Sequence, residues 1–342
     1  MPNSLATRRG AAPALSAGRA RTKPNPPKGQ EIQTFPPPVA VPDWARAHGR
    51  AGESEPLFCA GANRALLDAC LRRDPPCAGA LRQRLALTSA PASAKILRLN
   101  ADAAALRDLR FTATAEPPPA AKLLELWRDL TGRPPSLDAR RLANAAGLLD
   151  CPLAAADALA ESLSEQSRAG DPVSAAAKAA ALIFAAVPDA PAAEAEVLAL
   201  WAFDLVLALR LRWPRPLPLI ATKLLDPGLR SDGGGRRARP GDPDWPRTAA
   251  SAIALAAASA LDLAADLSRR ADILIAVAPK LRAKPAAKIV ILLLAQNCVG
   301  PAEAARQAPM TDRAARRLFD RLVALGAVRE FSGRPTFRLY DL

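Results

Sequence analysis

The chain has 342 residues, which is long enough for two or three domains and for a core that needs no disulfide bond or metal ion to stabilise it. Half of its residues are apolar, but alanine supplies much of that half, and the aromatic residues are only five Trp, eight Phe and one Tyr. Alanine favours helices and is depleted in strands, so the composition predicts an all-α body of closely packed helices.

The formal net charge of +14 is concentrated at the two ends of the chain. Residues 1–50 carry a net charge of +6 and residues 280–342 a net charge of +7, which leaves +1 for residues 51–279. Such an asymmetry is expected when both ends contact a polyanion and the middle does not. The alternative is that a protein rich in arginine and alanine is basic for compositional reasons alone.

The sequence lacks the common motifs of catalysis and of metal or cofactor binding. Its one histidine, His48, cannot build a catalytic triad or a zinc site alone, and no phosphate-loop, dinucleotide-binding or nucleophile-elbow motif occurs. The carboxylate pairs Asp262 with Asp266 and Glu194 with Glu196 have a spacing that could hold a metal ion, but solvated or capping carboxylates are the expected interpretation. We therefore expect a protein that is not an enzyme and that uses no cofactor or metal.

The chain has five cysteines, namely Cys59, Cys70, Cys77, Cys151 and Cys298. They form no Cys-x-x-Cys pair and their number is odd, so we expect small buried hydrophobic residues rather than disulfides or zinc ligands. Residues 1–29 lack the continuous apolar stretch of a secretory signal, which favours a cytoplasmic location. The longest apolar runs, 179–187 and 249–261, are shorter than the roughly 20 residues of a membrane-spanning helix, so we expect no membrane contact.

Residues 1–40 are rich in proline, glycine, serine and basic residues and predict a disordered basic arm. Residues 41–279 form the predicted helical body. Its first helix is expected at 62–73. Segment 77–111 predicts two or three helices with a break near residues 89–91, where proline interrupts the pattern.

In the middle of the body, proline and glycine bound the predicted helices. One helix is predicted at 120–130, the next begins at a Ser136 cap, and Pro172 occupies the first position of another. The longest candidate, at 190–213, is apolar on most sides and is predicted to be the central helix of the body.

Segment 226–247 contains three consecutive glycines and five arginines, which predict a flexible loop that attracts anions. One hypothesis is that this loop folds over the body and forms an arginine-lined anion site of an enzyme. It stands beside the hypotheses of DNA binding and protein docking given below. A pair of helices at 248–270 and 271–282 is predicted to lead to a C-terminal module, residues 280–342.

The C-terminal module begins with a buried helix at 285–298 and a short helix at 301–307. The turn "APMT" precedes a third helix with Thr311 as its N-cap. The predicted apolar face of the third helix consists of Ala315, Leu318, Phe319, Leu322 and Leu325. Its outer side carries Arg313, Arg316, Arg317 and Arg321. A short helix, a tight turn and a basic amphipathic helix predict a helix-turn-helix.

After Gly326, the runs "AVREF" and "TFRLY", joined by "SGRP", predict a β-hairpin. In the second run Phe337 and Leu339 face one side and Arg338 faces the other. A helix-turn-helix followed by a hairpin with a basic tip at Arg334 is typical of a winged helix. The predicted fold is therefore an all-α, Ala-rich, multi-helix body with a C-terminal winged helix.

We expect this module to bind nucleic acid, and double-stranded DNA in particular. The forked donors of Arg313, Arg316 and Arg317 suit contacts with base edges, and those of Arg329, Arg334 and Arg338 suit contacts with phosphates. The predicted DNA-binding residues are Arg313, Arg316, Arg317, Arg321, Arg329, Arg334 and Arg338. The alternative is an interaction scaffold whose winged helix docks a protein partner, and a homo-oligomer is compatible with both hypotheses.

Three segments, "WPRPLPL", "RPGDPDW" and "DRAARRLFDRLVALGAVREFSGRPTFRLY", resemble a family of uncharacterised proteins from high-GC bacteria that is defined by a domain of unknown function. The resemblance covers most of residues 40–342 and implies no activity, so no catalytic residue is carried over. The C-terminal segment separately resembles winged-helix tails of otherwise unrelated bacterial proteins, which supports the predicted fold more than a ligand.

Overall fold

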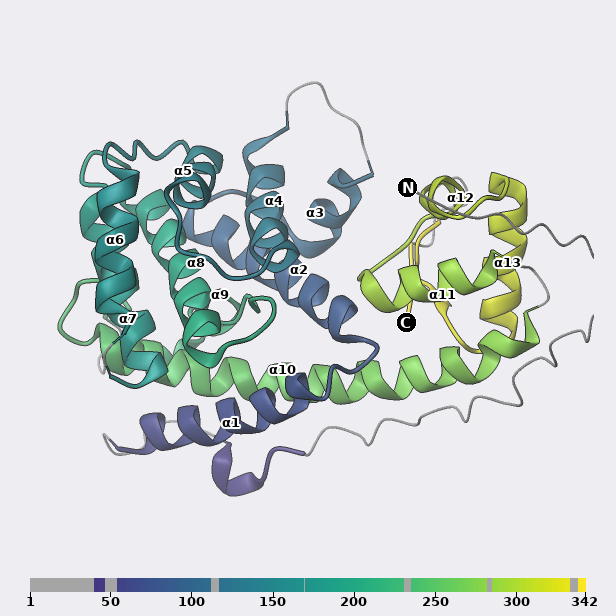
Figure 1. The fold of residues 1–342 in the computed structure, drawn as a ribbon, viewed down its shortest axis with the longest axis horizontal. Coiled ribbons are helices and arrows are strands. Elements are labelled where there is room, and N and C mark those ends of the chain that lie inside the picture. The colour runs from purple at the N-terminus through teal and green to yellow at the C-terminus, as the bar shows by residue number, and fades with distance from the viewer. Residues whose placement is uncertain are drawn as a thin grey trace, which may run out of the picture. The chain divides into compact units, whose positions relative to one another are not determined.

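The computed structural model describes residues 40–46, 54–111, 117–168, 170–230, 235–281, 285–332 and 338–342 (Figure 1). These residues belong to one compact unit, residues 34–342. The predicted basic arm lies outside the described residues except for Ala40, and so does Arg334.

The α-helices of the described residues are α1 (Ser54–Arg72), α2 (Ala78–Ile96), α3 (Ala103–Leu109), α4 (Pro119–Gly132), α5 (Ala139–Leu148), α6 (Ala156–Gln166), α7 (Pro172–Ala186), α8 (Ala192–Leu211), α9 (Ile220–Lys223), α10 (Trp245–Val277), α11 (Ala286–Ala295), α12 (Pro301–Gln307) and α13 (Asp312–Ala324). The short 3-10 helices are η1 (Asp43–Ala45), η2 (Pro227–Leu229) and η3 (Ala278–Lys280). The strands β1 (Arg329–Glu330) and β2 (Tyr340–Asp341) form a two-stranded sheet. The predicted all-α class is confirmed.

Helix α8 is the centre of the body, as its apolar composition predicts. Every residue from Ala195 to Ala208 is buried, and the helix packs most extensively on α7, with further contacts to α9, α2 and α4. Asp204 is fully buried in this helix, and its carboxylate accepts hydrogen bonds from the main-chain N–H groups of Leu219 (2.8 Å) and Ile220 (3.2 Å). The side chain of Asp204 therefore holds the start of α9.

Residues 248–277 form one continuous helix, so the predicted pair of helices is wrong. Helix α10 has 33 residues, and its one proline, Pro246, lies at its first turn, where the missing N–H is not needed. The predicted break falls at Arg270, which instead pairs with Asp266 one turn earlier at 2.8 Å. Such an i, i+4 pair stabilises the helix up to the supposed boundary.

Helix α10 lies beside α1 and also contacts α7, α9 and α2, so it connects distant parts of the chain (Figure 1). By length and composition alone, residues 245–280 are apolar enough to cross a membrane. Within the most apolar window of this helix, 61% of the residues are buried against the rest of the chain. A helix buried in a protein core can be as long and as apolar as a membrane-spanning helix.

Helix α2 also crosses a predicted boundary, since it continues through Pro91 without a break. Proline removes one helical hydrogen bond, which weakens the helix locally. Ala90 and Ala94 on either side are fully buried, and the hydroxyl of Ser93 donates to the carbonyl of Ser89 at 2.9 Å. Tertiary packing on α4 therefore outweighs the local cost of the proline.

The helix caps follow the sequence pattern with one correction. Asp102 and Asp171 cap α3 and α7 through their side chains, and Pro172 occupies the first position of α7. Helix α5 is capped by Asp138 rather than by Ser136, whose hydroxyl instead donates to the Asp138 carboxylate at 2.7 Å. All five cysteines are buried, as expected.

Candidate nucleic-acid interface

The C-terminal helices α11, α12 and α13 follow one another through short connections. Four residues separate α12 from α13, whose N-cap is Thr311, and the Thr311 hydroxyl oxygen accepts the N–H of Ala314 at 3.2 Å. Strands β1 and β2 are antiparallel, with Glu330 opposite Tyr340, and Val299 bridges to Tyr340 from the other side. The segment before α12 and the two strands after α13 therefore lie side by side.

The apolar face of α13 packs inward as predicted. Ala315, Leu318, Phe319 and Leu322 are buried, and Leu325 is partly buried. The ring of Phe319 stacks on that of Tyr340 with centroids 4.3 Å apart and an angle of 9° between the planes. This stack joins α13 to β2 and fixes which side of the helix faces outward.

All four arginines of α13 are exposed, but they differ in their partners. Arg316 pairs with Asp312 one turn earlier at 2.9 Å. Arg313, Arg317 and Arg321 form no hydrogen bond or ion pair within the described part of the chain. They lie four residues apart, so they form a stripe of three unpaired cations along one side of the helix, which we call the arginine stripe.

The two described arginines of the strand region are each paired with a carboxylate. Arg338 is exposed and lies 3.5 Å from Asp320 of α13. Arg329 lies 2.8 Å from Asp341, and the hydrogen bond to this carboxylate raises the pKa of Arg329. Leu339 is buried and Arg338 exposed, as the alternating pattern predicts, whereas Phe337 lies outside the described residues.

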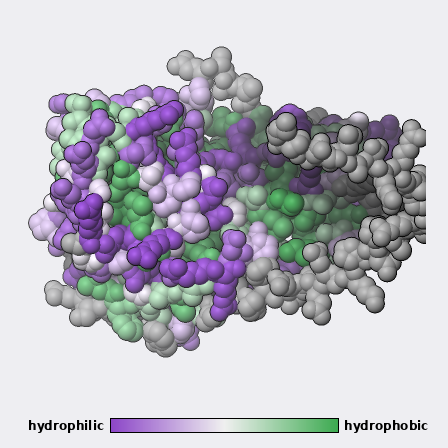
Figure 2. Space-filling model, viewed as in Figure 1, coloured by the Kyte–Doolittle hydropathy of each residue, from purple (hydrophilic) through white to green (hydrophobic). Residues whose placement is uncertain are grey.

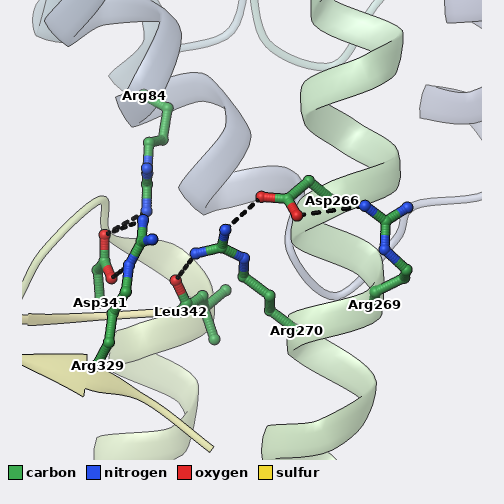
Figure 3. Close-up of polar contacts among 7 residues, drawn as sticks. All are labelled: Arg84, Asp266, Arg269, Arg270, Arg329, Asp341 and Leu342. Carbon is green, nitrogen blue, oxygen red and sulfur yellow. Dashed lines mark hydrogen bonds and ion pairs between the residues drawn. The ribbon is translucent and has the colours of Figure 1, made fainter.

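Asp341 is the residue that sequence reasoning missed. Its carboxylate binds both Arg329 of β1 and Arg84 of α2, and its side chain is only 5% exposed (Figure 3). Nearby, Arg270 of α10 donates to the main-chain oxygen of Leu342 at 2.7 Å. These contacts fasten β2 to the body, so Arg329 has a structural partner in addition to its predicted role. An acidic residue within a basic segment was the only signal in the sequence.

Three of the five arginines of segment 226–247 are likewise paired with acids. Arg237 and Arg239 form ion pairs with Glu196, which is fully buried in α8, and Arg236 pairs with Asp242 at 2.7 Å. Burial raises the pKa of Glu196, and Arg237 opposes that shift. The segment also contains η2 and the first turn of α10. Its described parts are thus tied to the body by internal ion pairs rather than arranged as an open anion site.

Three of the four acids considered as metal ligands are engaged in ion pairs. Asp262 pairs with Arg46, Asp266 with Arg269 and Arg270, and Glu196 with its arginines. Where the structure describes the chain, no group of three or more histidine, cysteine or acidic side chains could hold a metal ion.

Hydrophobic residues gather at the surface over α11, and hydrophilic residues cover much of the body over α5 and α6 (Figure 2). On α11, Ile291 is 64% exposed, and Val323 on α13 is also exposed. The C-terminal segment therefore presents apolar as well as basic surface.

Residues 30–342 match the family described as "Protein of unknown function (DUF1403)". The chain belongs to this family. The match includes the body and the whole C-terminal segment. It confirms the predicted resemblance to an uncharacterised family, and the family description assigns no activity. None of the curated proteins compared with it matches.

Proposed function

We propose that the chain binds double-stranded DNA through a C-terminal winged helix formed by residues 285–342. In this proposal α12 and α13 are the helix-turn-helix, α13 is the recognition helix, and the segment between β1 and β2 is the wing. The order of three helices followed by two antiparallel strands supports this assignment, as does the bridge from Val299 to β2.

The observation that carries the proposal is the arginine stripe. Exposed arginines that already bind a carboxylate are partly neutralised, whereas Arg313, Arg317 and Arg321 keep their full charge and donors. Long forked donors on the outer side of a helix can reach base edges in the major groove or the phosphates that flank it. The stacked Phe319 and Tyr340 rings keep this side of α13 directed outward.

Arg316 and Arg338 have secondary parts in the proposal. Their ion pairs with Asp312 and Asp320 lie at the surface, where water screens them and they contribute little to stability. Phosphate oxygens can therefore replace these carboxylates at little cost. Arg329 differs because the carboxylate of Asp341 that binds it is buried, and it chiefly positions β1.

The test measures binding of the full chain to double-stranded DNA by fluorescence anisotropy at several salt concentrations. The triple variant R313A/R317A/R321A should weaken binding and reduce the slope of log affinity against log salt by up to about 3, because roughly one counterion is released for each phosphate contact. The matched control R73A/R140A/R247A removes the same charge from exposed positions outside the C-terminal segment and should leave the slope unchanged. Equal losses in both variants would refute the interface.

The second candidate function is docking of a protein partner, and the exposed Ile291 and Val323 favour it. Protein interfaces have apolar centres with polar rims. If the wild-type chain binds DNA without any salt dependence, or does not bind it, while I291D abolishes association with a partner protein, the scaffold replaces the DNA-binding proposal.

A further inference from the structure

A cavity of about 480 Å³ that is open to solvent lies where the end of α3 meets one side of α4. Its apolar lining includes Leu109, Ala121 and Leu124. Its volume falls within the range of small-molecule sites in proteins, roughly 300 to 1,000 Å³, and is far larger than a single water molecule needs. The cavity is separate from the arginine stripe on α13.

Three arginines, Arg110, Arg128 and Arg133, line the cavity, and two of them are already paired. Arg133 binds Asp129 at 2.8 Å. Arg110 binds Glu303 of α12 at 2.5 Å and donates to the carbonyl of Cys298 at 3.1 Å. These contacts hold both guanidinium groups in place, and the two carboxylates offset much of their positive charge.

Arg128 has no carboxylate partner in the part of the chain that the structure describes. The only protein acceptor of its guanidinium there is the side-chain oxygen of Gln296, at 3.3 Å. Glu125 precedes Arg128 by one turn and also lines the cavity, but the two form no ion pair. The fork of Arg128 therefore retains donors for a planar anion.

The surroundings of Arg128 destabilise its charged form, because the guanidinium group is largely removed from water. Burial and, to a smaller extent, the neighbouring charge of Arg110 lower the pKa of Arg128 to about 10, and the charge of Glu303 opposes this shift. Desolvation of a cation is normally compensated by a counter-charge, and an anion at this position would supply one.

We propose that this cavity binds a small organic monoacid, whose carboxylate or phosphate group lies on Arg128 and whose apolar part packs against Leu109, Ala121 and Leu124. An inorganic ion would leave the apolar lining unfilled. A second acidic group on the ligand would meet Glu125 and Asp129, which disfavours diacids. This proposal does not rest on the proposed DNA binding, because none of the contacts that carry it involves α13.

The test is isothermal titration calorimetry of the full chain without DNA. The probes are 4-phenylbutyrate, its neutral amide, phenyl phosphate and inorganic phosphate. We expect the two organic anions to bind, and we expect the amide and inorganic phosphate to bind at least tenfold more weakly. Comparing 4-phenylbutyrate with phenyl phosphate then shows which acidic group the site prefers.

Two variants separate the anion contact from the cavity itself. R128Q should weaken binding of 4-phenylbutyrate at least tenfold, and R128K should have an intermediate effect because it keeps the charge without the fork. A121F leaves Arg128 intact but fills the cavity, so it should also block binding. The matched control R140Q changes an exposed arginine of α5 that does not line the cavity and should bind as wild type.

Unchanged affinity in R128Q, with a melting temperature like that of wild type, would overturn the proposal. Equal binding of the acid and its amide would do so as well, and so would equal binding of inorganic phosphate and 4-phenylbutyrate. DNA binding is measured separately with the same protein preparations. This measurement distinguishes failure of the anion-site proposal from failure of the DNA-binding proposal.

Discussion

Arg84 and Asp341 are 257 residues apart in the sequence and form an ion pair with a nitrogen–oxygen distance of 2.5 Å. The Asp341 side chain is 5% exposed and that of Arg84 is 23% exposed, so both groups are largely removed from water. Arg329 binds the second oxygen of the same carboxylate. One buried acid thus pairs with two cations and joins the body to the C-terminal strand (Figure 3).

Changing Asp341 to Asn should destabilise the protein. Removing one partner of a fully buried ion pair costs roughly 3 to 5 kcal/mol, and the partial exposure of Arg84 should reduce the cost to about 2 to 3 kcal/mol. The measurement is the free energy of unfolding in urea. R269A, which removes the exposed arginine that pairs with Asp266, should change this free energy by less than about 0.5 kcal/mol. A D341N chain as stable as wild type would mean that the pair does not hold β2.

The buried carboxylate of Asp204 predicts a pH dependence of stability. Burial raises the pKa of Asp204 well above its ordinary value of 3.8, against the opposing effect of the hydrogen bonds from Leu219 and Ile220. Between the unfolded and the folded pKa, the folded chain holds a proton that the unfolded chain has lost. The contribution of Asp204 to stability should therefore be highest below its unfolded pKa and should fall as pH rises towards its folded pKa.

The contribution of Asp204 is obtained by comparing wild type with D204N from pH 3 to pH 9. The difference in the free energy of unfolding between the two proteins should change with pH in favour of D204N as pH rises. D204A also removes the acceptor for the buried N–H groups of Leu219 and Ile220. It should be less stable than wild type at every pH, by roughly 1 to 3 kcal/mol for each N–H group left unpaired. A difference between wild type and D204N that does not vary with pH would contradict the assigned shift.

Substitution of Phe319 should disrupt the C-terminal segment. F319A removes a fully buried ring that stacks on Tyr340, at an expected cost of roughly 2 to 5 kcal/mol. The same cost applies to replacing Leu318 by Ala, because both side chains face the core. V323A, on the exposed part of the same helix, should lie within about 0.5 kcal/mol of wild type in thermal and urea unfolding.

The arginine stripe predicts a division between sequence-specific and general contacts. At a preferred site, selected from a random double-stranded library, R313A and R317A should each cost roughly 1 to 3 kcal/mol of binding free energy and relax the preference at one base position. R316A is the matched control on the same helix, and its effect should be smaller because Asp312 already binds Arg316. Losses that are equal for all sequences would place α13 across the DNA backbone instead of in the groove.

Arg334 lies outside the described residues, and its position at the wing tip stays a prediction from the sequence. R334A should weaken binding to all DNA sequences about equally and lower the salt slope by about one, because a phosphate contact positions the protein without specifying a sequence. The readout is the ratio of affinities for preferred and random DNA, which should not change in R334A. A lower ratio would assign Arg334 to base contacts.

Local patterns in the sequence predicted α12 and α13 closely, including the Thr311 cap and the buried face around Phe319. The helix breaks predicted at residues 89–91 and near Arg270 were wrong, because the two helices continue through these positions. Both rested on local signals, and the packing of α2 and α10 against several other helices outweighs them. The cavity on α4 was not predictable, since its lining depends on how the end of α3 meets that helix.

The sequence by itself determined the helical class, the Thr311 cap of α13 and the outward direction of the four arginines of this helix. These properties depend on side chains within about one or two turns of each other, and helical spacing encodes them directly. Tertiary structure alone decided which of the charges are free. Arg329 meets a carboxylate that also binds Arg84 of α2, and Arg128 remains unpaired although Glu125 is one turn away. The reason is that ion pairing depends on distances across the folded chain, and no spacing along the sequence specifies them.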